Sequence, residues 1–103
     1  SFEHAREDMH ARALREHRVE GERLADAVRG ALAADGGLLS QDERGEIDRL
    51  LEALERALPG DDARAIKRAS EALNRATDSF AARRMDEGVR RALAGRSIAN
   101  LDL

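Results

Sequence analysis

The sequence predicts an all-α fold, in which a long N-terminal helix is followed by an antiparallel helical bundle of three to four helices. Charged residues make up 38% of the 103 residues and aromatic residues only 2%. Such a composition favours exposed helices around an aliphatic core and is poor for strands. The apolar residues also recur at three- and four-residue spacing, which is the helical pattern. A chain of this length supports one small core, so we expect a single domain.

The first helix is expected from Phe2 to Ala34, because only Gly21 and Gly30 weaken it, each by about 1 kcal/mol relative to alanine. The next residues, Asp35-Gly36-Gly37, should end it, since glycine readily takes the left-handed conformation of a C-terminal cap. The apolar residues of the two halves differ. The second half has one bundle-facing stripe, made of Leu24, Ala27, Val28, Ala31 and Leu32. The first half has a sparse set spread around the axis, namely Phe2, Met9, Leu14 and Val19.

Two further helices complete the bundle. Ser40 and Glu43 have the spacing of a capping box, which starts the second helix, and Pro59-Gly60 ends it. Asp61 or Asp62 can cap the third helix. The second helix has an apolar stripe of Ile47, Leu50, Leu51, Leu54 and Leu58, and the third one of Ile66, Ala69, Leu73, Ala76 and Phe80.

The apolar register of the third helix fails after Phe80. The next core positions hold Arg83, Arg84 and Glu87, whereas Met85, Val89, Ala92 and Leu93 lie on a face rotated by about 100° or more. The helix therefore bends or breaks near residues 77–82, or its last part packs against a different neighbour. We favour a bend or a separate short helix. Gly95 is expected to end the helical run. The predicted divisions are a protruding half-helix at 1–20, a bundle at 21–95 and a flexible tail at 96–103.

No pattern of side chains indicates catalysis or metal binding. His10 and His17 share a helix face but stand about 10 Å apart along the axis, and His4 with Asp8 has no further ligand nearby. We interpret the adjacent Asp61 and Asp62 as capping residues at a helix N-terminus. An arginine group near the C-terminus suits a helix end better than nucleic acid, because acidic residues interrupt it; its members are Arg83, Arg84, Arg90, Arg91 and Arg96.

The overall charge and the absence of cysteine favour an ordinary cytoplasmic protein. The net charge of −3 combines both signs throughout the chain, so no nucleic acid or membrane partner is indicated. Without cysteine the chain has no disulfide and no thiolate metal site, which suits a reducing compartment. No apolar run approaches the roughly 20 residues of a membrane span. The chain starts at Ser1 inside an already helical pattern, which suggests a piece of a larger protein.

Several segments, in this order, resemble the C-terminal lid of the HscA-type iron–sulfur assembly chaperones, a bacterial branch of the seventy-kilodalton heat-shock family. Residues 32–36 and 38–40, followed by Glu43-Arg44, resemble the end of the long lid helix and the start of the next. Residues 60–62 with Ala65-Ile66 are similar to the following junction. The most specific segments are 80–86 (FAARRMD) and 89–95 (VRRALAG). The resemblance covers essentially the whole chain.

The resemblance implies a regulatory lid rather than an enzyme. The parent would be an ATPase whose nucleotide-binding domain, which holds ATP and Mg, lies outside this chain, as does a peptide-binding β-sandwich. The lid would close over a bound client peptide and slow its release during iron–sulfur cluster assembly in the bacterial cytoplasm. The implied partners are that β-sandwich, the client scaffold IscU and the co-chaperone HscB. No cofactor is implied for this chain itself.

The resemblance also implies where the lid meets the sandwich. Residues 18–26 would form the latch through charged contacts, so the candidate hinge and latch residues are Arg18, Gly21, Glu22 and Asp26. Gly21 would mark the flexible point, because a missing side chain weakens the helix locally. In relatives such as DnaK, an acidic residue and a histidine form the latch, and gapless spacing puts these positions at Glu22 and Asp26. Asp26 departs from the histidine.

The alternative function is a stand-alone helical interaction module that dimerises through its first helix. An isolated helix of about 20 residues is marginal in water unless one face is buried. We therefore expect the isolated chain either to fray before about Glu20 or to associate with a second copy of itself.

Overall fold

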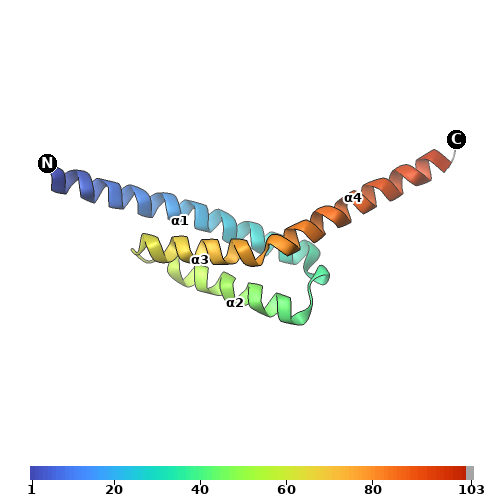
Figure 1. The fold of residues 1–103 in the computed structure, drawn as a ribbon, viewed down its shortest axis with the longest axis horizontal. Helices are drawn as coiled ribbons and strands as arrows, with labels where there is room; N and C mark the ends of the chain where they lie inside the picture. The colour runs from blue at the N-terminus through green and yellow to red at the C-terminus, as the bar shows by residue number, and fades with distance from the viewer. Residues whose placement is uncertain (102–103) are drawn as a thin grey trace.

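A computed structural model of the chain describes residues 1–101, with side chains up to Arg96. It contains four α-helices and a short 3-10 turn, and within the described residues there is no strand, so the predicted all-α fold is confirmed. The molecule measures 73 × 31 × 17 Å, because α1 and α4 extend from a central bundle toward opposite ends (Figure 1). The elements in order are α1 (Phe2–Asp35), η1 (Gly36–Leu38), α2 (Gln41–Ala57), α3 (Ala63–Ala76) and α4 (Asp78–Leu101).

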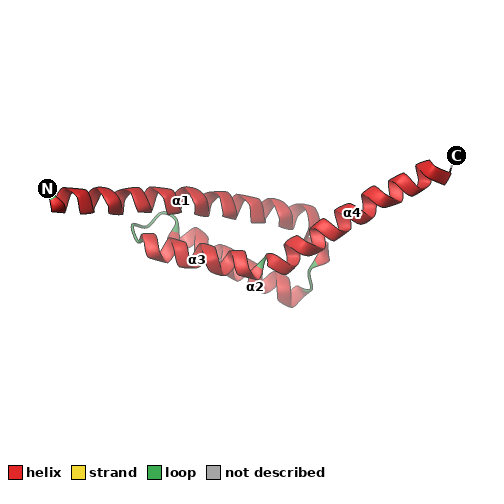
Figure 2. Ribbon diagram, turned by 45° about the horizontal axis from the view of Figure 1, so that its top comes forward, coloured by secondary structure: helices red, strands yellow, loops and turns green. Residues whose placement is uncertain are grey.

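The bundle consists of the second half of α1, packed beside α2 and α3 (Figure 2). Its core is aliphatic except for one aromatic ring, as the composition predicts, and Leu54, Ile66 and Leu73 are fully buried. Burying each such side chain stabilises the fold by about 1.5–3 kcal/mol. The other buried apolar residues are Ala25, Val28, Ala31, Leu32, Ile47, Leu51 and Phe80.

The bundle-facing stripe of α1 differs from the predicted one at a single position. Val28, Ala31 and Leu32 are buried as predicted, but Ala25 is 1% exposed whereas Ala27 is exposed to solvent. Leu24 is partly buried at the edge of the core. Both alanines fit the apolar periodicity, and the rotation of α1 about its axis, which the larger side chains set, decides between them.

The end of α1 also differs from the prediction. Gly36 has right-handed dihedral angles (φ −55°, ψ −24°), and within residues 1–101 no glycine has a positive φ. The predicted left-handed cap is therefore wrong. The Gly36 amide still donates to the Leu32 carbonyl, and the Leu39 amide donates to the Gly36 carbonyl at 3.1 Å, so the chain leaves α1 through a 3-10 turn. A Cβ at Gly36 would lie 2.9 Å from Arg44 Nη1, which is the end of a flexible side chain, so this contact alone does not require glycine there.

The predicted caps of α2 and α3 are present. The Glu43 amide donates to Ser40 Oγ at 3.2 Å and the Ser40 amide donates to Glu43 Oε1 at 2.9 Å, which completes the capping box. Of the two candidates for the α3 cap, the structure uses Asp62, whose Oδ1 accepts from the Ala65 amide at 3.1 Å. Both helices therefore begin where their side chains satisfy amides that the helix leaves free.

The break between α3 and α4 lies at Thr77, within the predicted interval. The Thr77 hydroxyl donates to the carbonyls of Leu73 and Asn74 at 3.0 Å each, so it competes with the backbone at this turn. α4 then starts in a new direction (Figure 1). At 24 residues it is not the short helix that we favoured.

The first turns of α4 are fixed to the bundle by one apolar and two ionic contacts. Phe80 is 2% exposed, and the Arg84 guanidinium lies 5.9 Å from its ring centroid. Arg83 Nη1 donates to the Leu38 carbonyl and to Glu43 Oε1, both at 2.9 Å, and its Nη2 donates to Glu43 Oε2. Arg84 Nε donates to Asp35 Oδ2 at 2.8 Å. These arginines thus take core-register positions by pairing with acids from α1 and α2.

Beyond Arg84, α4 leaves the bundle and remains helical to Leu101. The prediction that Gly95 ends the helix is wrong. A glycine inside a helix costs only about 1 kcal/mol, and none of the described glycines adopts the left-handed conformation that would cap it. Of the predicted tail, Asp102 and Leu103 lie outside the described residues.

Gly21 and Gly30 provide a matched test of packing between α1 and the bundle. A Cβ at Gly21 would lie 2.7 Å from Leu58 Cδ2 and 3.3 Å from Ser70 Oγ, whereas one at Gly30 would meet nothing within 4 Å. We expect Gly21→Leu to lower the free energy of unfolding by about 1–3 kcal/mol through overpacking. Gly30→Leu should raise it by up to about 1 kcal/mol through helix propensity. Urea unfolding of both variants tests this, and equal effects would contradict the close approach at Gly21.

Glu43 makes the stability of the fold depend on pH. The hydrogen bond from Arg83, together with that from the Ser40 amide, lowers the pKa of the Glu43 carboxyl from 4.5 to about 2. A carboxyl with a depressed folded-state pKa stabilises the fold above its ordinary pKa, and this contribution disappears as the pH falls from 4.5 to about 2. Glu43→Gln should therefore be less stable than the parent chain at pH 7, and the difference should shrink with acidification. Thermal unfolding across this range measures it; a constant difference would contradict the assignment.

Candidate functional site

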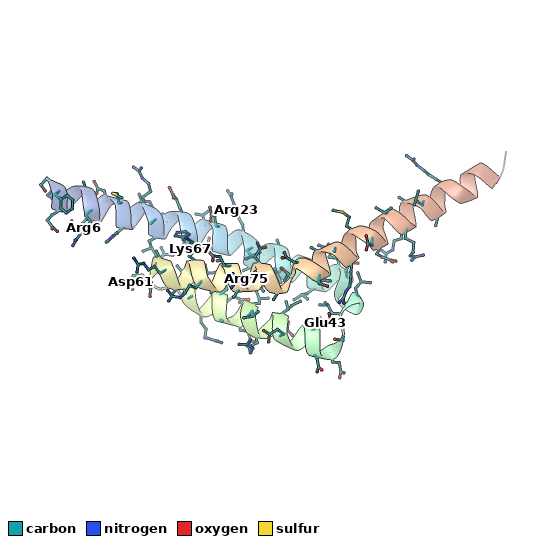
Figure 3. All side chains as sticks on the ribbon, in the orientation of Figure 1. Arg6, Arg23, Glu43, Asp61, Lys67 and Arg75 are labelled. Atoms are coloured by element: carbon teal, nitrogen blue, oxygen red, sulfur yellow. The ribbon has the colours of Figure 1, made fainter. Side chains whose placement is uncertain are left out.

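The first three turns of α1, residues 2–12, form an arm that is exposed on every side. In Figure 3 the arm extends past the loop that joins α2 to α3, and side chains such as Arg6 project from it. Phe2 is 77% and Met9 69% exposed. These two residues lie seven positions apart, so they share one side of the helix, about 100° from the side that Gly21 turns to the bundle. Two large apolar residues thus mark one face of the arm.

The arm joins the bundle at Leu14 and Arg18. Leu14 is partly buried against the core. Arg18 Nε donates to the Leu58 carbonyl at 2.9 Å and its Nη2 donates to the Gly60 carbonyl at 2.6 Å. These acceptors lie just beyond the C-terminal end of α2, where carbonyls lack helical partners and a cation is favourable. Arg18 therefore holds the root of the arm to the loop that joins α2 to α3.

Gly21 packs α1 tightly against the bundle. It is buried, and the nearest atoms to a hypothetical Cβ come from Leu58, Ser70 and Ile66. The absent side chain lets α1 approach α3 more closely than any other residue would allow. The hinge role that the resemblance implied for Gly21 stays a prediction, and the structure gives this residue a packing role in addition.

Glu22 and Asp26 lie on the outer side of α1, and both are exposed. Asp26 Oδ1 accepts from Arg29 Nη1 at 3.1 Å, and Arg29 Nη2 pairs with Glu55 of α2 at 2.7 Å. The hydrogen bond that Arg29 donates to Glu55, together with the negative charge of that carboxylate, raises the pKa of the Arg29 guanidinium. Of the four candidate residues, Arg18 and Gly21 therefore face the bundle, whereas Glu22 and Asp26 face solvent, Asp26 while paired with Arg29.

The remaining surface carries many charged side chains, some of which form ion pairs within their own helix. A cleft between the first half of α1 and the start of α3 is lined by His10, His17, Asp61 and Asp62, among others. Within residues 1–101 there is no cluster of three or more histidine, aspartate or glutamate residues arranged to hold a metal ion. None of the described helices combines the length and apolar character needed to cross a membrane.

Comparison with known proteins identifies the family. The family model described as Hsp70 protein matches residues 1–86, which is most of the chain. This chain belongs to the Hsp70 family. It is 57% identical over 100 residues to a protein of Ralstonia pickettii named chaperone protein HscA homolog, and 52% identical over 103 residues to one of that name from Pseudomonas putida. A Burkholderia mallei protein of the same name is 54% identical over 98 residues.

These alignments cover 97%, 99% and 95% of this chain but only 16–17% of the length of each relative. The chain therefore corresponds to a segment of an Hsp70-type chaperone, and the resemblance to HscA-type proteins holds over that whole segment. The complete relatives are about six times longer than this chain.

The protruding half of α4 is a feature that sequence reasoning located only in part. The rotated apolar face was predicted, but the structure leaves it uncovered: Met85 is 71%, Val89 53% and Leu93 56% exposed. The partners of Arg18 and Arg83 were missed altogether, because they lie 40 or more residues away along the chain. For Arg83 the local signal was an arginine at a position where the helical register calls for an apolar residue.

Removing the side chain of Arg18 should loosen the root of the arm. Arg18→Ala deletes two charged hydrogen bonds to the end of α2, which we expect to lower the free energy of unfolding by about 1–2 kcal/mol. Arg12→Ala, which changes an exposed arginine of the arm itself, is the control and should leave stability nearly unchanged. Urea unfolding measures both. Equal stability of the two variants would mean that Arg18 does not hold the arm.

Proposed function

We propose that this chain is the lid of the substrate-binding domain of an ATP-dependent, HscA-type chaperone. In this role it closes over a bound client peptide and slows its release during iron–sulfur cluster assembly. The observation that carries the proposal is the exposed arm in a chain that belongs to the Hsp70 family. The arm has two large apolar residues, Phe2 and Met9, with no covering element in the described chain.

The way in which the arm is attached to the bundle supports the proposed lid function. A lid must transmit the position of its body to the part that covers the client, so the two need a stiff connection. Here α1 is continuous from the arm into the bundle, and Arg18 and Gly21 fix its root to α2 and α3. The bundle thus serves as a brace rather than as a binding site. In this proposal the arm lies over the β-sandwich that holds the peptide.

The outer charges of α1 suit the latch. Glu22 and Asp26 lie one turn apart on the exposed side, so both are available to basic groups of the sandwich. ATP and Mg would bind in the nucleotide-binding domain of the parent, and this chain would take no cofactor and perform no catalysis. The client IscU, the co-chaperone HscB and a bacterial cytoplasmic location belong to the same proposal and follow from the resemblance to HscA.

Deleting this segment from the complete parent chaperone tests the proposal. Without the lid, a bound fluorescent client peptide should dissociate at least about tenfold faster, because nothing retains it in the closed state. Basal ATP hydrolysis should change little, since the nucleotide site lies in another domain. Stopped-flow peptide release and steady-state ATPase assays measure the two quantities. An unchanged peptide dissociation rate would refute the lid.

Point variants then separate the latch from the lid as a whole. Glu22→Lys combined with Asp26→Lys should speed peptide release in the parent by reversing the charges that meet the sandwich. Glu52→Lys, on the exposed surface of α2, is the matched control and should leave release unchanged. If the deletion accelerates release but the double variant does not, the lid stands and the latch lies elsewhere.

A further inference from the structure

The protruding half of α4 carries the densest exposed apolar surface in the described chain. Met85, Val89 and Leu93 follow each other at four-residue spacing, and Ala92 lies beside them on the same side of the helix. By contrast, the arm presents two large apolar residues over a similar length. A helix that leaves such a stripe in water is expected to bury it against a partner.

The two flanks of the stripe differ in chemistry. At about 100° per residue, Asp86 and Arg90 lie on one flank. The other flank has Gly88 at its centre, with Ala81 and Gly95 seven residues to either side. A side chain added at Gly88 would meet nothing within 4 Å, so no contact within its own chain requires glycine at this position. It therefore leaves room for another helix to approach closely.

These flanks select an antiparallel copy of the same helix. When two identical helices pair antiparallel, each flank meets the same flank of its partner, whereas in a parallel pair opposite flanks meet. An antiparallel pair centred near Gly88 places Asp86 opposite the partner's Arg90 and Arg90 opposite the partner's Asp86, and brings the two glycine flanks together. A parallel pair would set both charges against glycine. Charge complementarity thus favours the antiparallel arrangement.

The present contacts of Arg90 are compatible with this arrangement. Its Nε and Nη2 donate to Glu87 at 3.0 and 2.6 Å. The guanidinium has five N–H donors, so Nη1 remains for a second carboxylate. Because α4 points away from the bundle, the bundles of the two copies would lie at opposite ends of the pair (Figure 1).

We propose that the chain forms a two-fold symmetric dimer through the α4 stripe of Met85, Val89, Ala92 and Leu93, with the two helices antiparallel and centred near Gly88. The interaction does not depend on the proposed lid function, and it differs from association through the first helix. The partner is a second copy of this chain. The two copies recognise each other through a seam formed by their α4 stripes and through two reciprocal ion pairs between Asp86 and Arg90.

Sedimentation equilibrium of the 103-residue chain tests the dimer. Val89→Glu should raise the dimer dissociation constant at least about tenfold, because it places a charge in the seam. Val19→Glu is the matched control, since Val19 is a similarly exposed valine (46% against 53%) on α1. It should leave the dissociation constant unchanged, and circular dichroism checks that both variants fold. A monomer up to the solubility limit, or a loss of dimer with Val19→Glu alone, would overturn the proposal.

The orientation is tested separately by charge exchange and cross-linking. Asp86→Arg or Arg90→Asp alone should weaken the dimer, and the two together should restore it. The chain has no cysteine, so single cysteines report contacts directly. Met85→Cys mixed with Ala92→Cys should yield a disulfide-linked pair, whereas Met85→Cys alone should not, because disulfides require Cα atoms within about 7 Å. Efficient linkage of Met85→Cys to itself would mean a parallel pair and overturn the model of the seam.

Discussion

The mismatch in length between α1 and its partners is the constraint on which the rest of the structure depends. α1 has 34 residues, whereas α2 and α3 have 17 and 14. At 1.5 Å per residue these helices measure about 51, 26 and 21 Å. The shorter pair and the loop between them therefore cannot cover the whole of the long helix. The first third of α1, residues 2–12, projects beyond them and contributes nothing to the core of this bundle.

A projecting helix is useful only if its direction is defined. In α1 the contacts of Arg18 and Gly21, where the bundle begins to cover the helix, define that direction. Gly21 removes the spacing that a side chain would impose, so α1 rests directly on Leu58 and Ile66. Arg18 then reaches the carbonyls where α2 ends. The last covered turns are thus the most constrained ones. Any bending of α1 within a larger protein is easier before Leu14 than at Gly21, because bending at Gly21 would first have to break these contacts.

Sequence reasoning succeeded where the determinants are local. The capping box of Ser40 and Glu43, the break near Thr77 and the apolar stripe of α2 all depend on residues within one or two turns of each other. It failed where geometry at a distance decides. Ala25 and Ala27 both fit the apolar periodicity of α1, and only the rotation of the helix about its axis decides which of them is buried. Gly36 could have ended α1 in either a left-handed or a right-handed backbone conformation, and the side chain nearest to it, Arg44, comes from the following helix.

The candidate site shows the same division. The exposure of Phe2 and Met9 could be anticipated, because a sparse pattern does not form a stripe. The separate roles of Arg18 and Glu22 could not, since only the fold shows that one faces a loop forty residues away and the other faces solvent.

The two projecting ends of the molecule are suited to different partners, and the spacing of their apolar residues explains why. Phe2 and Met9 lie two turns apart, and Val19 faces another direction, so the first helix offers isolated contacts rather than a continuous seam. Isolated contacts suit a shaped surface that supplies most of the interface itself, such as a folded domain. The α4 residues recur at every turn, from Met85 to Leu93, with small residues alongside, as helix-to-helix pairing requires. Association through a second copy is therefore better served by α4 than by α1, which leaves the arm free to contact a folded domain.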